Sequence, residues 1–295
     1  MTDPASRPWR LYLLLLLVML IWSLNFIATK IALKEVPGAL LSGIRLLMAA
    51  IFLVPVYYWS KNKKGKTWSV ADGWRMAMLG AVGIAANQVF FIMGIARTTV
   101  SHAAFIIGIV PLAVLALTAV LGHELLSIRK ISGIFLALSG VALLQTRAAV
   151  VQGPSVFGDL LILGSALTFA CYIVFGKPMV AAHGPFIPTV FAFVSGAILL
   201  LPMTIYLALG FDFTKVSFAA WSSVFYMAMA SSVIASILYY HVLGQLPASR
   251  VSTFSYLQPL MATSLGIVML GEPISGVLLS GGALILSGVF LTERG

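Results

Sequence analysis

The side chains best placed to do chemistry in this sequence are polar groups that stand inside long apolar stretches. Trp22, Asn25 and Thr29 follow an i, i+3, i+7 spacing, which puts them on one face of a helix. A polar group in hydrocarbon is costly unless it faces protein or water, so each is a functional candidate. Asn25 can exchange hydrogen bonds with a zwitterion, or it can instead join one helix to another.

Amides, hydroxyl groups and aromatic rings in other apolar stretches fit the same kind of site. The predicted substrate-binding set is Trp22, Asn25, Thr29, Asn87, Gln88, Phe91, Tyr172, Ser236, Tyr239, Tyr240, Tyr256 and Gln258, with Ser232, Ser252 and Thr263 on the same helix faces. Such a lining would suit a ligand with an ammonium group, a carboxylate and a partly apolar body. Hydrogen bonding between helices, with aromatic rings as filler, is the alternative for any single residue.

Charged residues inside or beside the apolar stretches are few. We predict two gates, Lys30 with Glu272 at the outer side and Lys177 with Glu124 at the inner side. The alternative is that the lysines snorkel to the membrane surface and the glutamates favour helix N-termini. Arg45 could attract an anionic group or could reach the lipid headgroups.

Two prolines and a stripe of small residues are predicted to shape the helices. Pro111 and Pro259 each stand inside an apolar stretch, where proline removes a backbone hydrogen bond and bends a helix. Small residues at helical spacing favour close helix packing. Here the stripe consists of Gly133, Ala137 and Gly140, with Gly281 and Gly288 at matching positions in the second half.

The composition indicates that the apolar stretches cross a membrane. Of 295 residues, 61% are hydrophobic and 9% are charged, whereas a soluble domain carries about a quarter charged residues. Apolar runs of about 20 residues form helices in a bilayer, because lipid-facing strands leave backbone groups unsatisfied. Ten such helices are predicted: Leu11–Leu33, Leu40–Tyr58, Trp74–Ile95, His102–Leu121, Ile128–Leu144, Leu160–Met179, Phe186–Leu209, Ala219–Leu243, Val251–Leu270 and Ile274–Leu291.

Topology accounts for the net charge of +10 without nucleic acid. Loops on the cytoplasmic side retain Lys and Arg, and placing both termini inside puts most cations there. The inner set is Arg7, Arg10, Lys61, Lys63, Lys64, Lys66, Arg75, Arg129, Lys130, Arg250 and Arg294, against Lys34, Arg97, Arg147 and Lys215 outside. We therefore expect a multi-pass protein of a cell inner (plasma) membrane, surrounded by lipid.

The sequence repeats itself at half its length. With an offset of 148 residues, 15 of the 43 pairs from residue 101 to residue 143 are identical, including Pro111 with Pro259 and Glu124 with Glu272. The repeats, 11–144 and 160–291, would each hold five helices, an odd number that inverts the second relative to the first. The predicted fold is thus an all-α integral membrane protein of two inverted five-helix repeats around a central cavity, an architecture that supports alternating access.

At this point the chain resembles the EamA-type branch of the drug/metabolite transporter superfamily. The residues that carry the resemblance are Trp22-Ser23-Leu24-Asn25-Phe26, Arg45, Pro259, Gly271-Glu272-Pro273 and Gly281. The first half departs from the pattern, with Gly122-His123-Glu124 where the second half reads Gly271-Glu272. The resemblance implies a small-metabolite carrier, commonly an exporter of amino acids or related compounds.

These observations together predict a secondary transporter that exports small polar or zwitterionic metabolites, acting as a monomer or homodimer without cofactor or metal. A membrane scaffold or receptor, or an intramembrane lipid-modifying enzyme without a recognisable motif, is the alternative. The sequence contains no His-Glu-x-x-His, Gly-x-Ser-x-Gly or Walker pattern. Cys171 is the single cysteine, so an intrachain disulfide is impossible.

Overall fold

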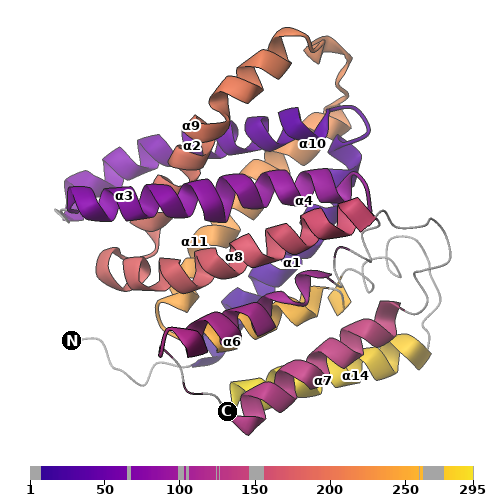
Figure 1. Ribbon diagram of the computed structural model, residues 1–295. Coiled ribbons are helices and arrows are strands. Elements are labelled where there is room, and N and C mark those ends of the chain that lie inside the picture. The colour runs from indigo at the N-terminus through magenta and orange to yellow at the C-terminus, as the bar shows by residue number, and fades with distance from the viewer. Residues whose placement is uncertain are drawn as a thin grey trace.

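The computed structural model describes residues 8–64, 68–98, 103, 106–123, 125, 127–145, 156–258, 260–261 and 276–294. Regular structure in these residues is helical throughout (Figure 1). In the described part of the chain, helices long and apolar enough to cross a membrane are Trp9–Ala32, Gly38–Tyr58, Val70–Ile95, Val156–His183, Phe186–Leu209 and Phe218–Leu243. Val110–Val120 and Leu279–Thr292 are shorter apolar helices.

Short connections join the helices, and two of the long ones change their winding midway. The elements are α1 (Pro8–Ala32), α2 (Gly38–Lys64), α3 (Val70–Leu79), the π-helix η1 (Gly80–Ala86), α4 (Asn87–Ile95), α6 (Val110–Val120), α7 (Ile128–Gln145), α8 (Val156–His183), α9 (Phe186–Leu209), the 3₁₀ turn η3 (Phe213–Lys215), α10 (Phe218–Tyr226), the π-helix η4 (Met227–Ile234), α11 (Ala235–Leu243), α12 (Ala248–Thr253), the 3₁₀ turn η5 (Phe254–Tyr256) and α14 (Gly276–Glu293).

The fourth predicted helix differs from the observed one. A continuous helix was expected over His102–Leu121, but α6 begins only at Val110, after a turn at Gly108 and Ile109. Pro111 therefore stands in the first turn of α6, where the missing backbone N–H costs nothing. The chain is interrupted just before this proline rather than bent at it. Its counterpart Pro259 lies outside the described residues.

Several local features recur at positions 147 or 148 residues apart. The π-helix η1 lies between α3 and α4, and the π-helix η4 lies between α10 and α11 at the matching place. Ile109 N donates to Ile106 O, and Leu257 N donates to Phe254 O, so a tight turn precedes the proline position in both halves. The two halves thus share irregular backbone as well as sequence.

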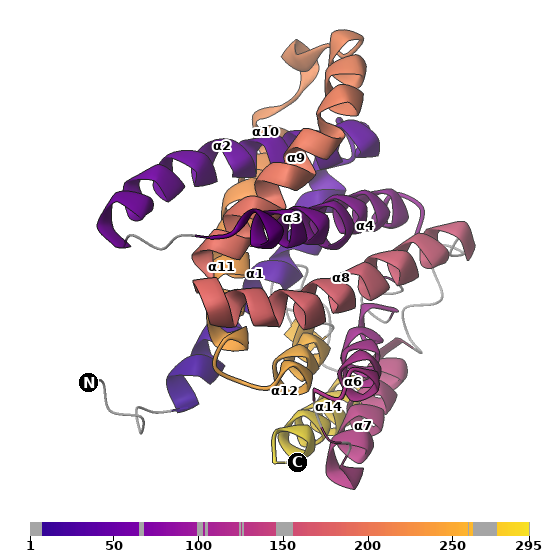
Figure 2. The same ribbon diagram turned by 60° about the vertical axis from the view of Figure 1, so that its left-hand side comes forward.

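The helices α7 and α14 pack side by side at one end of the molecule (Figures 1 and 2). A Cβ atom added to Gly133 would lie 2.7 Å from the Gly288 carbonyl oxygen, and one added to Gly140 would lie 2.6 Å from that of Gly281. The helices are therefore antiparallel and in backbone contact. This confirms the predicted close packing through the small-residue stripe.

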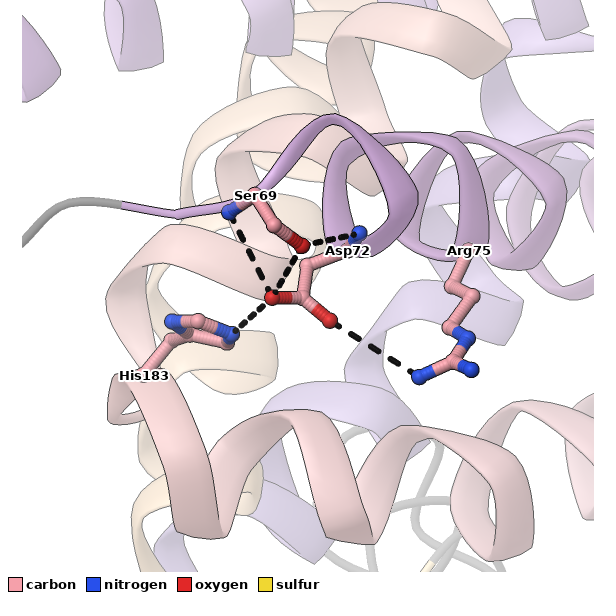
Figure 3. A network of polar contacts seen from close by, with 4 residues as sticks. All are labelled: Ser69, Asp72, Arg75 and His183. Carbon is pink, nitrogen blue, oxygen red and sulfur yellow. Dashed lines mark hydrogen bonds and ion pairs between the residues drawn. The ribbon is translucent and has the colours of Figure 1, made fainter.

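A polar cluster joins the start of α3 to the end of α8 (Figure 3). Ser69 and Asp72 form a capping box, in which Ser69 Oγ accepts from Asp72 N and the Asp72 carboxylate accepts from Ser69 N. His183 Nε2 lies 3.4 Å from Asp72 Oδ2, and Arg75 Nη1 lies 3.8 Å from Oδ1. The cluster places the beginning of α3 and the end of α8 at the same end of the molecule.

A second carboxylate links the turn between α1 and α2 to the connection that precedes α10. Glu35, in the turn between α1 and α2, accepts a 2.6 Å hydrogen bond from Ser217 N and a 2.7 Å bond from Ser217 Oγ. Ser217 in turn caps α10, since its Oγ accepts from Ala220 N. The backbone and hydroxyl hydrogen bonds from Ser217 lower the pKa of Glu35 below its ordinary value of 4.5.

The packing of α7 on α14 predicts that Gly288→Ala destabilises the protein. The new Cβ would meet Ala137 N at 2.4 Å and Gly133 O at 2.5 Å, and backbone atoms cannot move aside as a flexible side chain can. We expect a loss of about 1–3 kcal/mol, seen as a lower Tm of the detergent-solubilised protein. Gly276→Ala in the same helix is the control, because its added Cβ has no neighbour within 4 Å. Equal Tm values for the two variants would contradict this account of the interface.

The lowered pKa of Glu35 predicts a pH-dependent contribution to stability. A carboxylate whose pKa is lower in the folded state stabilises that state above its unfolded pKa and stops doing so as the pH falls through the folded value. The Tm of the native protein should exceed that of Glu35→Gln at neutral pH, and the difference should shrink as the pH falls below 4.5. A Tm difference that stays constant with pH would mean that the charge of Glu35 contributes nothing.

Candidate functional site

A cavity lies among the helices. Its lining comes from both halves of the chain and consists of Trp22, Asn25, Phe26, Arg45, Ile84, Asn87, Gln88, Phe91, Ile107, Val110, Ser165, Ala166, Phe169, Tyr172, Phe193, Ser231, Ser232, Ser236 and Gln258. The free space is about 100 Å³, and a single water needs about 10–15 Å³ of such space. The cavity can therefore hold a solute of several non-hydrogen atoms.

The first long helix supplies one wall of this cavity. The helix α1 packs against α10, η4 and α11, with Leu15, Val18 and Met19 fully buried. Trp22 and Asn25 face the cavity from the middle of α1. The indole N–H of Trp22 donates to the carbonyl oxygen of Ser231 in η4 at 3.2 Å, which fixes the ring across the site.

The π-helix η4 presents two serines toward α2. A π-helix carries one more residue per turn than its neighbours and often marks a functional site. Ser232 Oγ donates to Met227 O, five residues earlier, at 2.9 Å. The Oγ atoms of Ser231 and Ser232 then accept hydrogen bonds from Arg45 of α2, at 3.1 Å from Nη2 and 2.8 Å from Nε.

Aromatic rings form the opposite side of the cavity. Phe169 of α8 meets Trp22 edge-on at 5.4 Å between ring centroids. Tyr172 of α8 stacks on Tyr240 of α11 at 4.7 Å, and the Tyr240 hydroxyl donates to the Tyr172 carbonyl oxygen at 3.0 Å. Phe26 and Phe91 close another edge at 5.3 Å. The rings make this part of the site rigid and apolar.

Within the described part of the chain, four polar atoms of cavity residues are buried without a hydrogen-bond partner. They are Asn25 Oδ1, Arg45 Nη1, Gln88 Oε1 and Tyr172 Oη. Asn87, by contrast, is satisfied, since its Nδ2 donates to the carbonyl and hydroxyl oxygens of Ser165 at 2.8 and 2.9 Å. Buried polar groups are nearly always paired, so unpaired ones in residues that line a cavity are candidates for binding a ligand.

The structure brings most of the predicted substrate-binding residues to this cavity. Eight of the predicted residues line it: Trp22, Asn25, Asn87, Gln88, Phe91, Tyr172, Ser236 and Gln258. The remaining four lie behind the lining. Thr29 donates to Asn25 O at 2.7 Å, Tyr239 packs on Trp22 at 5.1 Å, Tyr240 packs on Tyr172, and Tyr256 is fully buried.

Sequence reasoning did not assign Ser165, Phe169, Phe193 and Ser231 to the site, and it left the direction of Arg45 open. The internal repeat carried a signal for one of them, because Phe169 stands 147 residues after Trp22. Arg45 also carried a signal, as an arginine in an apolar stretch. Which side of α2 would face the cavity was not readable from the spacing.

The two lysines of the predicted gates make equivalent contacts in the two halves. Lys30 Nζ donates to the carbonyl oxygens of Ile95 and Thr98 at 2.6 and 3.0 Å, just at and beyond the end of α4. Lys177 Nζ donates to the carbonyl oxygen of Leu246, 148 residues after Thr98. Carbonyl groups at a helix C-terminus lack helical partners and attract cations. The proposed glutamate partners, Glu124 and Glu272, lie outside the described residues.

Metal binding has no visible basis in the described part of the chain, where no group of three His, Cys, Asp or Glu side chains could hold an ion. The described residues that line the cavity offer one cation, neutral amides, hydroxyl groups and aromatic faces. Such groups can recognise a small polar solute.

Comparisons with known proteins identify the chain's relatives. The profile of the EamA-like transporter family matches residues 9–146 and 156–294. An uncharacterized transporter of Archaeoglobus fulgidus is 29% identical over 95% of this chain and 96% of its own. A "probable amino-acid metabolite efflux pump" of Salmonella typhimurium is 28% identical over 96% and 94%. A "probable terminal-alkyne amino-acid exporter" of Streptantibioticus cattleyicolor is 27% identical over 95% and 92%.

The fold also matches a solved structure. A crystal structure aligns with a TM-score of 0.77 over 98% of both chains, at 18% sequence identity. At this identity the match shows the fold alone.

Proposed function

Because the chain belongs to the EamA-like transporter family, which covers nearly its whole length, we propose that it exports small polar or zwitterionic metabolites as a secondary carrier. Amino acids or related compounds are the proposed substrates. The observation that carries this proposal is the central cavity, which lies among membrane-spanning helices and is lined by polar groups from both halves. The family and the named relatives are transporters and not enzymes.

The chemistry of the cavity supports a zwitterionic substrate. Arg45 supplies a positive charge, while Asn25 Oδ1 and Gln88 Oε1 are unpaired acceptors that can receive hydrogen bonds from an ammonium group. The rings of Trp22 and Phe169 accommodate an apolar body. Two of the relatives carry names that refer to amino-acid compounds, which agrees with this lining.

Ten helices in two inverted repeats would allow this cavity to open alternately to the two sides. The family profile matches once in each half of the chain. The antiparallel contact of α7 with α14 and the matching π-helices support a twofold relation between the halves. The contact of Asp72 with His183 agrees with an odd number of helices per repeat, which puts the start of the third helix and the end of the sixth on one side. Inverted repeats of nearly equal energy can exchange conformations around a fixed site.

We place both termini in the cytoplasm and the protein in a plasma membrane, as a monomer or homodimer that binds no nucleic acid. The distribution of Lys and Arg supports this orientation. The side chains that face outward are those expected beside lipid, for example Ile51, Leu199 and Leu286, which are 65%, 57% and 55% exposed. The multi-pass character itself follows from the family and the helices.

Transport by purified protein in sealed liposomes tests the proposed function. We expect saturable, protein-dependent flux of at least one amino acid from a panel that runs from glycine to phenylalanine. Asn25→Leu and Gln88→Leu remove the unpaired acceptors and should raise KM about tenfold, since each lost hydrogen bond costs about 1–2 kcal/mol. Leu199→Ala, on the lipid-facing side of α9, is the matched control and should behave as the native protein. Flux no greater than in protein-free liposomes for every solute would reject the carrier.

Labelling of the cavity tests the predicted inner gate between Lys177 and Glu124. In a Cys171→Ser background, Ser236→Cys places a thiol in the cavity. If Lys177 helps to close the inner side, Lys177→Met and Glu124→Gln should speed its labelling by a membrane-impermeant reagent from that side. Lys215→Met, at an exposed pair with Asp212, is the control. If Lys177→Met lowers the Tm but changes neither labelling nor transport, then Lys177 caps a helix end and does not act as a gate.

A further inference from the structure

A buried positive charge that has no carboxylate partner among the described residues lies at the wall of the cavity. Arg45 is 2% exposed and lies about two turns after the start of the 27-residue helix α2, which begins at Gly38. None of the described residues that line the cavity is acidic. Its hydrogen-bond partners are the hydroxyl groups of Ser231 and Ser232, which are neutral.

The remaining donors of Arg45 have the geometry that a carboxylate requires. A guanidinium group has five N–H donors in a planar fork. Ser232 accepts from Nε and Ser231 accepts from Nη2, while Nη1 has no partner although it is buried. Both hydrogens of Nη1 and the second hydrogen of Nη2 therefore have no partner among the described residues. Two parallel N–H groups of this kind bind a carboxylate or a similar oxyanion with high specificity.

The two serines hold the guanidinium in one orientation. The Ser232 hydroxyl group donates its hydrogen bond to Met227 O, so the lone pairs of Ser232 Oγ remain to accept a hydrogen bond from Arg45. Ser231 belongs to the same π-helix, and its backbone carbonyl oxygen also accepts the hydrogen bond from the Trp22 indole N–H. A fork that is fixed before the ligand arrives loses less conformational entropy on binding.

The internal repeat separates Arg45 from the residues that serve the architecture. Lys30 and Lys177 recur in the two halves and make equivalent contacts with helix ends. Arg45 has no such counterpart, because Ala192 stands 147 residues later. A buried unpaired charge costs several kcal/mol of stability. Since the second half has alanine in place of arginine at the matching position, the fold does not require a buried charge there.

The other described residues that line the cavity carry no charge to complement a cation. Asn25 Oδ1 and Gln88 Oε1 can accept hydrogen bonds from an ammonium group, but they accept equally well from a neutral hydroxyl or amide. An ammonium group without a carboxylate would in addition meet the positive charge of Arg45. The site is therefore electrostatically selective for one end of a zwitterion only.

We propose that Arg45 is the carboxylate-binding residue of the cavity, and that a solute needs a carboxylate, but not an ammonium group, in order to be carried. This inference rests on the proposed carrier function and narrows its substrate class. Amino acids meet the requirement, and so do small monocarboxylates that lack the amino group. Amino-acid amides and simple amines do not.

A matched series of solutes tests this inference on the full-length protein in liposomes. For each amino acid from glycine to phenylalanine, the flux is compared with that of its amide and of its deaminated carboxylate. We expect the amino acid and the deaminated acid to be carried with KM values within about tenfold of each other, because they share the charged contact. The amide should be carried at least about a hundredfold less efficiently, since loss of a buried charged contact costs this much or more.

Variants of Arg45 provide the second arm. Arg45→Gln should lower kcat/KM for carboxylates by about a hundredfold or more and abolish the preference for acid over amide. Arg45→Lys keeps the charge but not the fork, so it should weaken transport and retain the preference. The Tm of ligand-free Arg45→Gln should equal or exceed that of the native protein, because a buried unpaired charge is removed. Arg75→Gln is the control, since Arg75 is an exposed arginine.

The possible failures are distinguishable. Saturable flux that prefers amides or amines, or that Arg45→Gln leaves unchanged, would overturn the role of Arg45 while the carrier function stands. Absence of saturable flux for every solute would overturn both. If Arg45→Gln unfolds, the double variant Ser231→Ala, Ser232→Ala replaces it, because it removes the two hydroxyl groups that hold the guanidinium group. A loss of the preference for acid over amide in this double variant supports the inference. An unchanged preference contradicts it.

Discussion

Backbone and charged groups inside a membrane must find partners within the protein, because hydrocarbon offers none. Regular helices meet this requirement along most of their length. Departures from regular winding leave backbone groups unpaired, so they are tolerated only where protein or a polar cavity surrounds them. In the described part of the chain, the 3₁₀ turn η3 lies in a connection, whereas the departures within or next to the long helices lie beside the cavity. Ile84 of η1 and Ser231 of η4 both line it, as do Ile107 and Gln258 next to the interruptions before the two proline positions. Irregular backbone and the site are therefore one feature of the structure.

The same requirement explains how the ends of the helices are arranged. Lys30 and Lys177 reach the carbonyl groups at the ends of α4 and α11, and Ser69 and Ser217 cap the starts of α3 and α10. Each of these helices belongs to the corresponding place in its half. Close contact between the glycines of α7 and α14 adds packing where apolar burial alone gives little driving force in lipid. The duplicated features thus stabilise the ends of equivalent helices in both halves of the chain.

The residues that differ between the two halves determine the chemistry of the cavity lining. Arg45, Ser231 and Ser232 form a polar unit on one side only, and Trp22 and Phe169 face each other as unlike members of a repeated position. Recognition of an asymmetric solute needs an asymmetric lining. Arg45 is the one charged residue among the described lining residues, and a charge on one side of the cavity favours one orientation of a bound polar solute.

The sequence by itself determined the class of fold and the chemical types at the site. Apolar runs such as Phe186–Leu209 predicted helix limits that the structure reproduces, because length and hydropathy are local properties. Asn25, Gln88 and Tyr172 were recognisable as polar groups in hydrocarbon, and they line the cavity. The repeat was also readable, since the offset from Pro111 to Pro259 needs only residue identities.

Only the tertiary structure decided which polar groups meet. Thr29 shares the helix face of Trp22 and Asn25 but donates to its own helix, and Tyr240 lies behind Tyr172 instead of beside the cavity. The interruption before Pro111 was likewise hidden, because a turn of one or two residues does not change the apolar pattern. Arg45 could have faced lipid headgroups or the interior. Its direction depended on Ser231 and Ser232, more than 180 residues away, and on the extra residue per turn that brings both hydroxyl groups toward it.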